Sequence, residues 1–210
     1  MIDSPITQKL ADIEEQETLN LVRKELEAGT DPIEILEACR EGIVLVGKRY
    51  EKGEYFLPEL IMAGEIFNEL SEILRPALGG SRVNTKGTVV FGTVRGDVHD
   101  IGKEMVIAIL RGVGYEVYDL GVNVSAEQFV TKLQETGATI LGLSGLITTS
   151  YDSMKETVEA LAKAGLRDRV KIMIGGGVMN ANVQAYTGAD AYGNDPTEAV
   201  KLCQTFMGGN

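Results

Sequence analysis

The sequence predicts an α/β protein in which an N-terminal four-helix bundle precedes a five-stranded parallel sheet. In residues 1–78, apolar residues recur at helical spacing. Residues 79–86, GGSRVNTK, are polar and show no periodicity. From residue 87 onward, short β-branched runs alternate with helical stretches, which is typical of a parallel sheet covered by helices on both faces. We therefore expect a helical domain at 1–78, a linker at 79–86 and a sheet domain at 87–210.

The helical domain is expected to contain four helices. The segment Asp31-Pro32-Ile33-Glu34 begins one of them, because it combines a capping acid, a proline at the first helical position and a glutamate three residues after the cap. After Pro58, apolar residues recur every three or four positions, which predicts an amphipathic helix that ends before Pro76. The other two helical stretches lie near residues 5–13 and 15–28.

Strands and helices alternate in the second domain. The expected strands are residues 88–94, 116–120, 139–143, 171–174 and 189–192. The expected helices are residues 101–112, 126–136, 151–164 and 180–187, with a last helix from Pro196. In such a doubly wound sheet, ligands bind beyond the carboxyl ends of the strands, where the strand order reverses. The segment GDVHDIGK, residues 96–103, follows the first strand and holds the only histidine of the chain, His99.

Composition excludes several classes of function. The net charge of -11 over 210 residues and the absence of long basic runs argue against nucleic-acid binding. No stretch approaches the roughly 20 apolar residues of a membrane span, and the N-terminus lacks the pattern of a signal peptide. We therefore expect a cytoplasmic protein with no nucleic-acid or membrane partner. Cys39 and Cys203 show no metal-ligand spacing and are expected to be buried apolar residues.

His99 has a structural explanation and a chemical one. In the structural one, Asp97 or Asp100 caps a helix and His99 is simply a turn residue. A dinucleotide site would need G-x-G-x-x-G, a zinc site three or four protein ligands, and a nucleophilic triad a G-x-S-x-G turn, and the sequence supplies none of these. A macrocyclic metal cofactor needs only one axial nitrogen from the protein, so a single imidazole suits it.

Three separated motifs resemble a known family. They are Asp97-x-His99-x-x-Gly102, then after 41 residues Ser144-x-Leu146, then after 28 residues Gly175-Gly176. This spacing is similar to the cobalamin-binding signature of B12-dependent methionine synthase. It is also similar to that of the corrinoid proteins in methanol, methylamine and aromatic O-demethylation methyltransferase systems. EKGEYFLPEL, residues 51–60, resembles the end of the helical cap of that family, so the resemblance extends over about residues 5–205. The fold that it implies for the second domain is Rossmann-like, of the flavodoxin-like kind.

The resemblance implies that cobalamin or a related corrinoid binds with its own base displaced and with His99 as the lower axial ligand of the cobalt. It implies that Asp97 accepts a hydrogen bond from the second imidazole nitrogen, and that Ser150 extends this contact into a proton relay. By the same resemblance, Ser144 and Thr148 contact the base of the cofactor's nucleotide tail.

The remaining site residues are also expected from the resemblance. Gly175, Gly176 and Gly177 would let the backbone approach the buried tail, where a Cβ would collide. Gly102 opens a helix whose N-terminus suits a nearby phosphate. Tyr50 and Leu57 would cover the upper face of the corrin from the helical cap. The other expected cofactor contacts flank these motifs, and they are Gly96, Val98, Asp100, Ile101 and Leu146.

The function implied is methyl carriage through Co(I) and methyl-Co(III). A substrate-specific methyltransferase would load the methyl group, and an acceptor methyltransferase would pass it to tetrahydrofolate or a thiol. A reductive activase is a further expected partner, and residues 79–86 would act as a hinge. Two alternatives stay open: the B12-binding small subunit of a carbon-skeleton mutase, against which the helical domain counts, and a B12-dependent regulator, for which no basic DNA-reading module is present.

Overall fold

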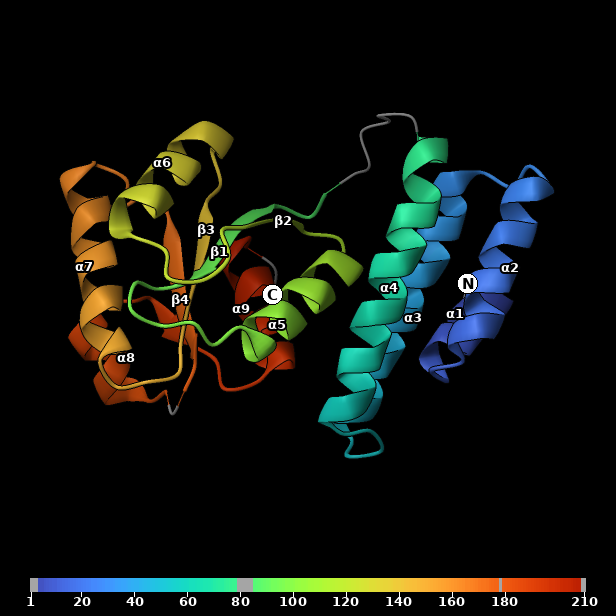
Figure 1. The fold of residues 1–210 in the computed structure, drawn as a ribbon, viewed down its shortest axis with the longest axis horizontal. Helices are drawn as coiled ribbons and strands as arrows, with labels where there is room; N and C mark the ends of the chain where they lie inside the picture. The colour runs from blue at the N-terminus through green and yellow to red at the C-terminus, as the bar shows by residue number, and fades with distance from the viewer. Residues whose placement is uncertain (1–3, 79–84, 178, 209–210) are drawn as a thin grey trace. The chain divides into compact units, whose positions relative to one another are not determined.

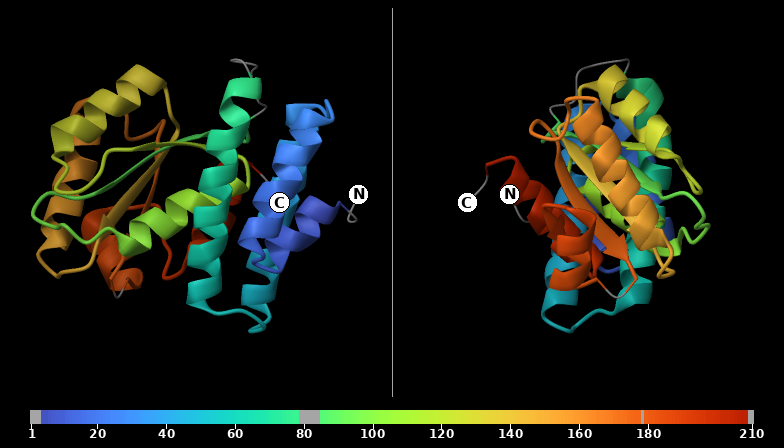
Figure 2. Two further views of the ribbon diagram at one scale, coloured as in Figure 1. Left: turned by 45° about the vertical axis from the view of Figure 1, so that its right-hand side comes forward. Right: turned by 90° about the vertical axis from the view of Figure 1, so that its left-hand side faces the viewer.

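The computed structural model describes residues 4–78, 85–177 and 179–208. The chain divides into two compact units, one containing the first four helices and one containing the sheet with its helices. Figures 1 and 2 show the ribbon of both units from three directions. The predicted linker at 79–86 lies mostly outside the described residues, so its role as a hinge stays a prediction.

The helical unit is the predicted four-helix bundle. It consists of α1 (Pro5–Ala11), α2 (Glu15–Glu27), α3 (Pro32–Glu51) and α4 (Leu57–Leu78). Asp31 caps α3 as expected, since its side chain accepts a hydrogen bond from the backbone N–H of Ile33. All four helices contribute to one apolar core, whose members include Leu10, Val22, Ile43, Val46, Leu60, Leu70 and Leu74.

The prediction that the last helix of the bundle ends before Pro76 was wrong. Helix α4 continues through Pro76 to Leu78. A proline removes one backbone N–H donor and crowds the carbonyl one turn earlier, but in the last turn of a helix this loss is limited to one hydrogen bond. Leu70 and Leu74 are fully buried in the turns just before it, and their packing offsets that loss.

The second unit contains the predicted five-stranded parallel sheet. Its strands are β1 (Thr88–Thr93), β2 (Glu116–Asp119), β3 (Ile140–Gly145), β4 (Lys171–Gly176) and β5 (Ala191–Tyr192). They lie in the order β2-β1-β3-β4-β5, and each neighbouring pair is parallel. This is the flavodoxin-like order, in which the connections change direction between β1 and β3. The expected binding edge is therefore at the carboxyl ends of these two strands.

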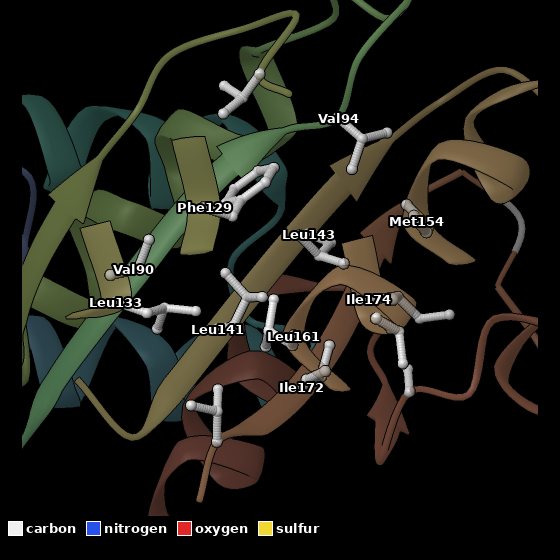
Figure 3. Close-up of a cluster of buried hydrophobic side chains, with 14 of the residues drawn as sticks. Val90, Val94, Phe129, Leu133, Leu141, Leu143, Met154, Leu161, Ile172 and Ile174 are labelled. Atoms are coloured by element: carbon white, nitrogen blue, oxygen red, sulfur yellow. The ribbon is translucent and has the colours of Figure 1, made fainter. Parts of the chain in front are cut away.

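Helices cover both faces of the sheet (Figure 1). They are α5 (Ile101–Gly112), α6 (Ala126–Thr136), α7 (Ser150–Lys163), α8 (Ala181–Thr187) and α9 (Pro196–Phe206). Side chains of α6 and α7, among them Phe129 and Leu161, pack against Val90, Leu141 and Ile172 of the strands (Figure 3). On the other face, residues of α5 and α9 lie over β1 and β4 and enclose a narrow cavity with them.

Two strands run further than the sequence predicts. β3 extends to Gly145 and β4 to Gly176, where we expected them to end at residues 143 and 174. The backbones of these extra residues pair in register, Ser144 with Gly175 and Gly145 with Gly176. Ladder pairing with a neighbour thus outweighs the poor strand propensity of serine and glycine. As a result, three predicted site residues stand on rigid strand ends and not on a loop.

Other expectations about individual residues can also be compared with the structure. Cys39 and Cys203 are buried and unpaired with each other, and burial raises the pKa of both thiols to about 12. Both are therefore inert apolar residues, as predicted. None of the described helices combines the length and the apolar composition needed to cross a bilayer.

Candidate functional site

The candidate site lies where the strand order reverses, at the carboxyl ends of β1 and β3. The turn after β1 carries Asp97 and His99 into α5, and the turn after β3 leads into α7 at Ser150. Asp97 and Ser150 are 53 positions apart, yet the two turns meet because β1 and β3 are adjacent strands.

Asp97 is the centre of this site. Its carboxylate is buried and accepts five hydrogen bonds. Oδ2 accepts from the Ser150 hydroxyl at 2.6 Å and from the backbone N–H groups of Leu146 and Ile147 at 2.7 and 3.2 Å. Oδ1 accepts from the His99 backbone N–H at 3.0 Å and contacts the ring nitrogen Nδ1 of His99 at 2.7 Å. One side chain therefore ties the two turns together and orients the imidazole.

The electrostatics of Asp97 follow from these contacts. Burial on its own would raise the pKa of the carboxyl group. The hydrogen bonds from Ser150, from the backbone and ring of His99 and from the backbone of Leu146 outweigh burial, and they hold the pKa well below its ordinary value. Asp97 is thus ionised at neutral pH and can accept a hydrogen bond from Nδ1 of His99 when that nitrogen carries a proton.

Asp97→Asn is expected to lower the free energy of unfolding of the sheet unit by about 2–3 kcal/mol at neutral pH, because hydrogen bonds to a charged acceptor are each worth about 1.5–3 kcal/mol. The pKa of Asp97 in the folded protein lies below its unfolded value of about 4. The carboxylate therefore stabilises the fold fully above about pH 4, and this contribution is lost progressively as the pH falls below about 4. Urea titrations between about pH 7 and about pH 3 should therefore show the difference shrinking in acid.

The matched control is Asp100→Asn, because Asp100 is an exposed aspartate of the same turn. That change should alter the unfolding free energy by less than about 0.5 kcal/mol at any pH. A difference between the wild type and Asp97→Asn that stays constant across the whole pH range would contradict the assignment.

His99 presents one nitrogen outward. Its Nδ1 faces the Asp97 carboxylate, so the neutral ring carries its proton there and keeps the lone pair on Nε2. The side chain is 52% exposed, which leaves the ring open to a ligand. Within the described residues, no three His, Cys, Asp or Glu side chains gather around it or elsewhere as a site for a bare metal ion. The geometry accordingly suits a metal that brings its other ligands with it.

Apolar side chains surround the imidazole on the surface. Val98 is 67% exposed, Ile101 is 72% exposed, and Leu146 and Ile147 from the turn after β3 are also exposed. A cluster of exposed branched side chains is typical of a binding surface. It gives His99 an apolar surround that a macrocycle could cover.

Two hollows adjoin this surround. The first, which we call the His99 hollow, is lined by residues 98–102 with Ser144, Leu146 and Gly176. The second, the α5–α9 hollow, runs along the sheet past Phe91, Met105, Gly175 and Ala199. Gly102, Ser144 and Gly176 line both hollows, so the two adjoin at these residues.

Glycines at and beside the shared wall let the backbones approach one another closely. A Cβ on Gly176 would lie 3.0 Å from the backbone N and O of Gly145 and from Oγ of Ser144. A Cβ on Gly177 would lie 2.9 Å from the carbonyl oxygen of Leu146. These features are compatible with a cofactor that has a side arm, since the imidazole could ligate its metal and the arm could enter the adjoining hollow.

The structure gathers most, but not all, of the predicted site residues. His99, Asp97 and Ser150 meet directly, and the three motifs that contain Gly102, Ser144 and Gly176 adjoin at the hollows. Thr148 lies in the turn after β3 with an exposed side chain, outside the lining of both hollows. Tyr50 and Leu57 belong to α3 and α4 of the helical unit, and their contact with a cofactor stays a prediction.

Sequence reasoning missed several residues of this region. Met105 and Ala199 line the α5–α9 hollow, although their spacing on the helices resembles that of ordinary core positions. Asn123 contacts the backbone of the turn that carries His99. Lys103, which follows that turn in the sequence, is fully buried. The one available signal for Asn123 was an asparagine in the connection after a strand, a position that often adopts unusual backbone angles.

An imidazole lone pair, an apolar surround and a glycine-walled hollow together describe a site for a metal macrocycle with a side arm. Comparison with known proteins gives the same class. Residues 87–201 match the model of the B12 binding domain, and residues 4–75 match a second B12 binding domain model. The chain therefore belongs to the B12-binding proteins, and it binds cobalamin or a related corrinoid.

Relatives over the whole length define the family more closely. A corrinoid protein of Desulfitobacterium hafniense is 36% identical over 97% of this chain and 96% of its own length. Trimethylamine corrinoid protein 1 of Methanosarcina acetivorans is 37% identical over 94% of this chain and 93% of its own. The chain is thus a member of the corrinoid proteins.

Solved structures agree with this membership. A cobalamin-binding protein from D. hafniense has a TM-score of 0.76 at 38% identity and covers 96% of both chains. The methanol:cobalamin methyltransferase complex of Methanosarcina barkeri contains a chain with a TM-score of 0.87 at 32% identity, covering 98% of this chain and 79% of that one.

Proposed function

We propose that this chain is a methyl carrier that serves a substrate-specific methyltransferase and an acceptor methyltransferase. The observation that supports it most is the contact line from Ser150 through Asp97 to the ring of His99. This line ends at Nε2, which we propose as the lower axial ligand of cobalt. When bound, the corrinoid supplies a cobalt that can alternate between Co(I) and methyl-Co(III).

The chain's own part is to hold His99 and its proton. While Nε2 is a ligand, the ring is neutral and its Nδ1–H donates to Oδ1 of Asp97. If Nε2 were not bound to cobalt, it could take up a proton, and the nearby carboxylate of Asp97 would stabilise the resulting imidazolium. Ser150 donates to the other oxygen of Asp97 and so keeps that carboxylate in place during both states. Proton uptake by His99 would thereby be linked to loss of its bond to the metal.

The partners are proposed from relatives. One relative is the trimethylamine corrinoid protein described above, another is the dimethylamine corrinoid protein of Methanosarcina barkeri, and one solved relative is part of a methanol:cobalamin methyltransferase complex. We therefore propose a methylamine or methanol as the class of methyl donor, and a separate methyltransferase as the protein that docks. Tetrahydrofolate or a thiol is the proposed final acceptor, and a reductive activase would restore Co(I).

The helical unit is proposed to shield the cofactor. The division that we propose is a cap at residues 1–78, a linker at 79–86 and a cofactor domain at 87–210. Leu57 is 42% exposed and Tyr50 is half-buried, so both offer apolar surface that could cover a bound corrin. A mutase subunit or a regulator is a weaker proposal, because the corrinoid relatives match this chain in both of its units.

The axial ligand can be tested by isotope labelling, because His99 is the only histidine of the chain. Protein grown with ¹⁵N-histidine is reconstituted with hydroxocobalamin and reduced to the paramagnetic Co(II) state. The electron spin resonance splitting from the axial nitrogen should change from the triplet of spin-one ¹⁴N to the doublet of spin-half ¹⁵N. A triplet that persists in the labelled protein would show that the cofactor keeps its own base and would refute the proposal.

Methyl carriage is tested separately with the same reconstituted protein. Reduced holoprotein is incubated with ¹⁴C-labelled methylamines or methanol and the matching methyltransferase, and label should appear on the protein-bound corrinoid. Holoprotein that retains the His99 ligand but accepts label from none of these donors with any of the matching enzymes would contradict the carrier function while leaving the axial assignment intact.

A further inference from the structure

The connection between β2 and α6, residues 120–124, runs alongside the turn that carries His99. Asn123 makes two hydrogen bonds to that turn. Its side-chain Oδ1 accepts from the backbone N–H of Gly96 at 2.8 Å, and its own backbone N–H donates to the carbonyl of Asp97 at 3.0 Å. One asparagine therefore holds the N–H of Gly96 and the carbonyl of Asp97.

The backbone of Asn123 explains why this residue type stands here. Its φ is +54°, in the left-handed region that glycine and asparagine adopt far more readily than branched residues do. This conformation directs both the amide N–H and the side chain of Asn123 toward the turn. Asparagine combines tolerance of that angle with a side-chain acceptor, and glycine would supply only the first of these.

The connection itself is anchored on both sides. Toward β2, the carboxylate of Asp119 accepts from the N–H of Gly121 at 2.9 Å and pairs with the buried Lys103. Toward α6, Ser125 and Gln128 form a reciprocal capping box. Asn123 is thus part of a braced segment and not of a free loop.

The same segment extends the sheet up to the turn. The N–H of Thr93 donates to the carbonyl of Gly121, and the N–H of Val124 donates to the carbonyl of Thr93, both at 2.9 Å. The hydroxyl of Thr93, which is fully buried, donates to the carbonyl of His99 at 2.9 Å. The turn is therefore fixed from β1 at His99 and from the connection at Gly96 and Asp97.

We propose that Asn123 is a positioning residue for the axial ligand, acting through its acceptor contact with the N–H of Gly96. This inference rests on the proposed function, in which His99 ligates cobalt. By holding the backbone before Asp97, Asn123 keeps the carboxylate aligned with Nδ1 and keeps Nε2 directed outward. Without the side-chain acceptor, the turn samples other conformations and the ligated state is less populated.

The test compares Asn123→Gly with Asn123→Asp. Glycine accepts the positive φ but lacks the acceptor, whereas aspartate keeps the acceptor at the same angle. Each protein is saturated with hydroxocobalamin and reduced to Co(II), and the ratio of His99-ligated to unligated cobalt is read from the ¹⁵N-histidine splitting. Asn123→Gly should lower this ratio about fivefold, which corresponds to roughly 1 kcal/mol. Asn123→Asp should stay within about twofold of the wild type.

A second readout does not involve the cofactor. In the apoprotein, nitrogen NMR of the only imidazole gives the fraction of the tautomer with its proton on Nδ1. That fraction should be lower in Asn123→Gly than in the wild type and should return in Asn123→Asp. The control is Val122→Gly, which adds the same backbone freedom to the connection one residue earlier and leaves the Asn123 side chain in place.

The outcomes separate the two proposals. A wild-type protein without His99 splitting defeats the proposed function, and the positioning of the imidazole by Asn123 is then judged from the tautomer fraction of the apoprotein alone. A wild type with His99 splitting, together with an Asn123→Gly variant of unchanged ratio and tautomer fraction, overturns the role of Asn123. An equal loss in Val122→Gly, or no recovery in Asn123→Asp, also overturns it, because either result would assign the effect to general loosening of the connection.

Discussion

Lys103→Ala is expected to lower the free energy of unfolding of the sheet unit by about 3–5 kcal/mol, the range for breaking a buried ion pair. The side chain of Lys103 is fully buried, and its Nζ contacts both carboxylate oxygens of Asp119 at 2.7 and 2.8 Å. Alanine would leave Asp119, whose side chain is 23% exposed, without its cation and would also open a cavity where the aliphatic stem packs. Urea denaturation of the apoprotein measures the loss.

Two further variants show which carboxylate contact of Lys103 stabilises the fold. Glu104→Gln removes the other carboxylate that contacts Nζ of Lys103, but Glu104 is 56% exposed, so we expect a loss below about 1 kcal/mol. In Lys103→Met with Asp119→Asn, no buried charge is left unpaired, and the asparagine oxygen can still accept from Gly121. The double variant should therefore be more stable than Lys103→Met alone. A Lys103→Ala protein no less stable than Glu104→Gln would contradict the argument.

This lysine also shows the limit of sequence reasoning. Lysines are almost never fully buried unless they are paired, and the pair here joins residues 16 positions apart on α5 and β2. Neither periodicity nor local spacing indicates such a contact. Asn123 is comparable, since its acceptor contact with Gly96 depends on the path of a connection 27 positions away. Long-range polar contacts of this kind follow from the assembled fold.

Local patterns were more informative. The helices α5 and α6 begin and end at the predicted residues, because their apolar periodicity is bounded by clear turn signals. The proximity of Asp97 and His99 follows from their spacing of two residues within one turn. Ser150 could be placed beside them only through a family resemblance, since its contact with Asp97 needs β1 and β3 to be neighbours. Strand ends at Gly145 and Gly176 were missed because ladder pairing overrides local propensity.

Gly176→Ala is expected to weaken retention of hydroxocobalamin at least tenfold, equivalent to about 1.4 kcal/mol. Gly176 has a φ of +108°, and a Cβ there would press on the backbone of Gly145 and on Oγ of Ser144. Because β3 and β4 are paired at these residues, neither strand can shift without loss of ladder hydrogen bonds. The added methyl group would narrow both hollows at the wall that they share. A displacement of the strands that relieved the crowding would have the same effect.

The effect of a side chain at a positive φ must be separated from the effect of crowding at Gly176. Gly165, in the turn after α7, also has a positive φ, +69°, but a Cβ there would meet no described atom within 4 Å. Gly165→Ala should therefore lower the unfolding free energy by about 1 kcal/mol and leave cobalamin retention after gel filtration unchanged. If Gly176→Ala retained cobalamin as the wild type does while losing the same stability as Gly165→Ala, Gly176 would be needed for the backbone angle only. The side arm would then have to lie away from the wall formed by β3 and β4.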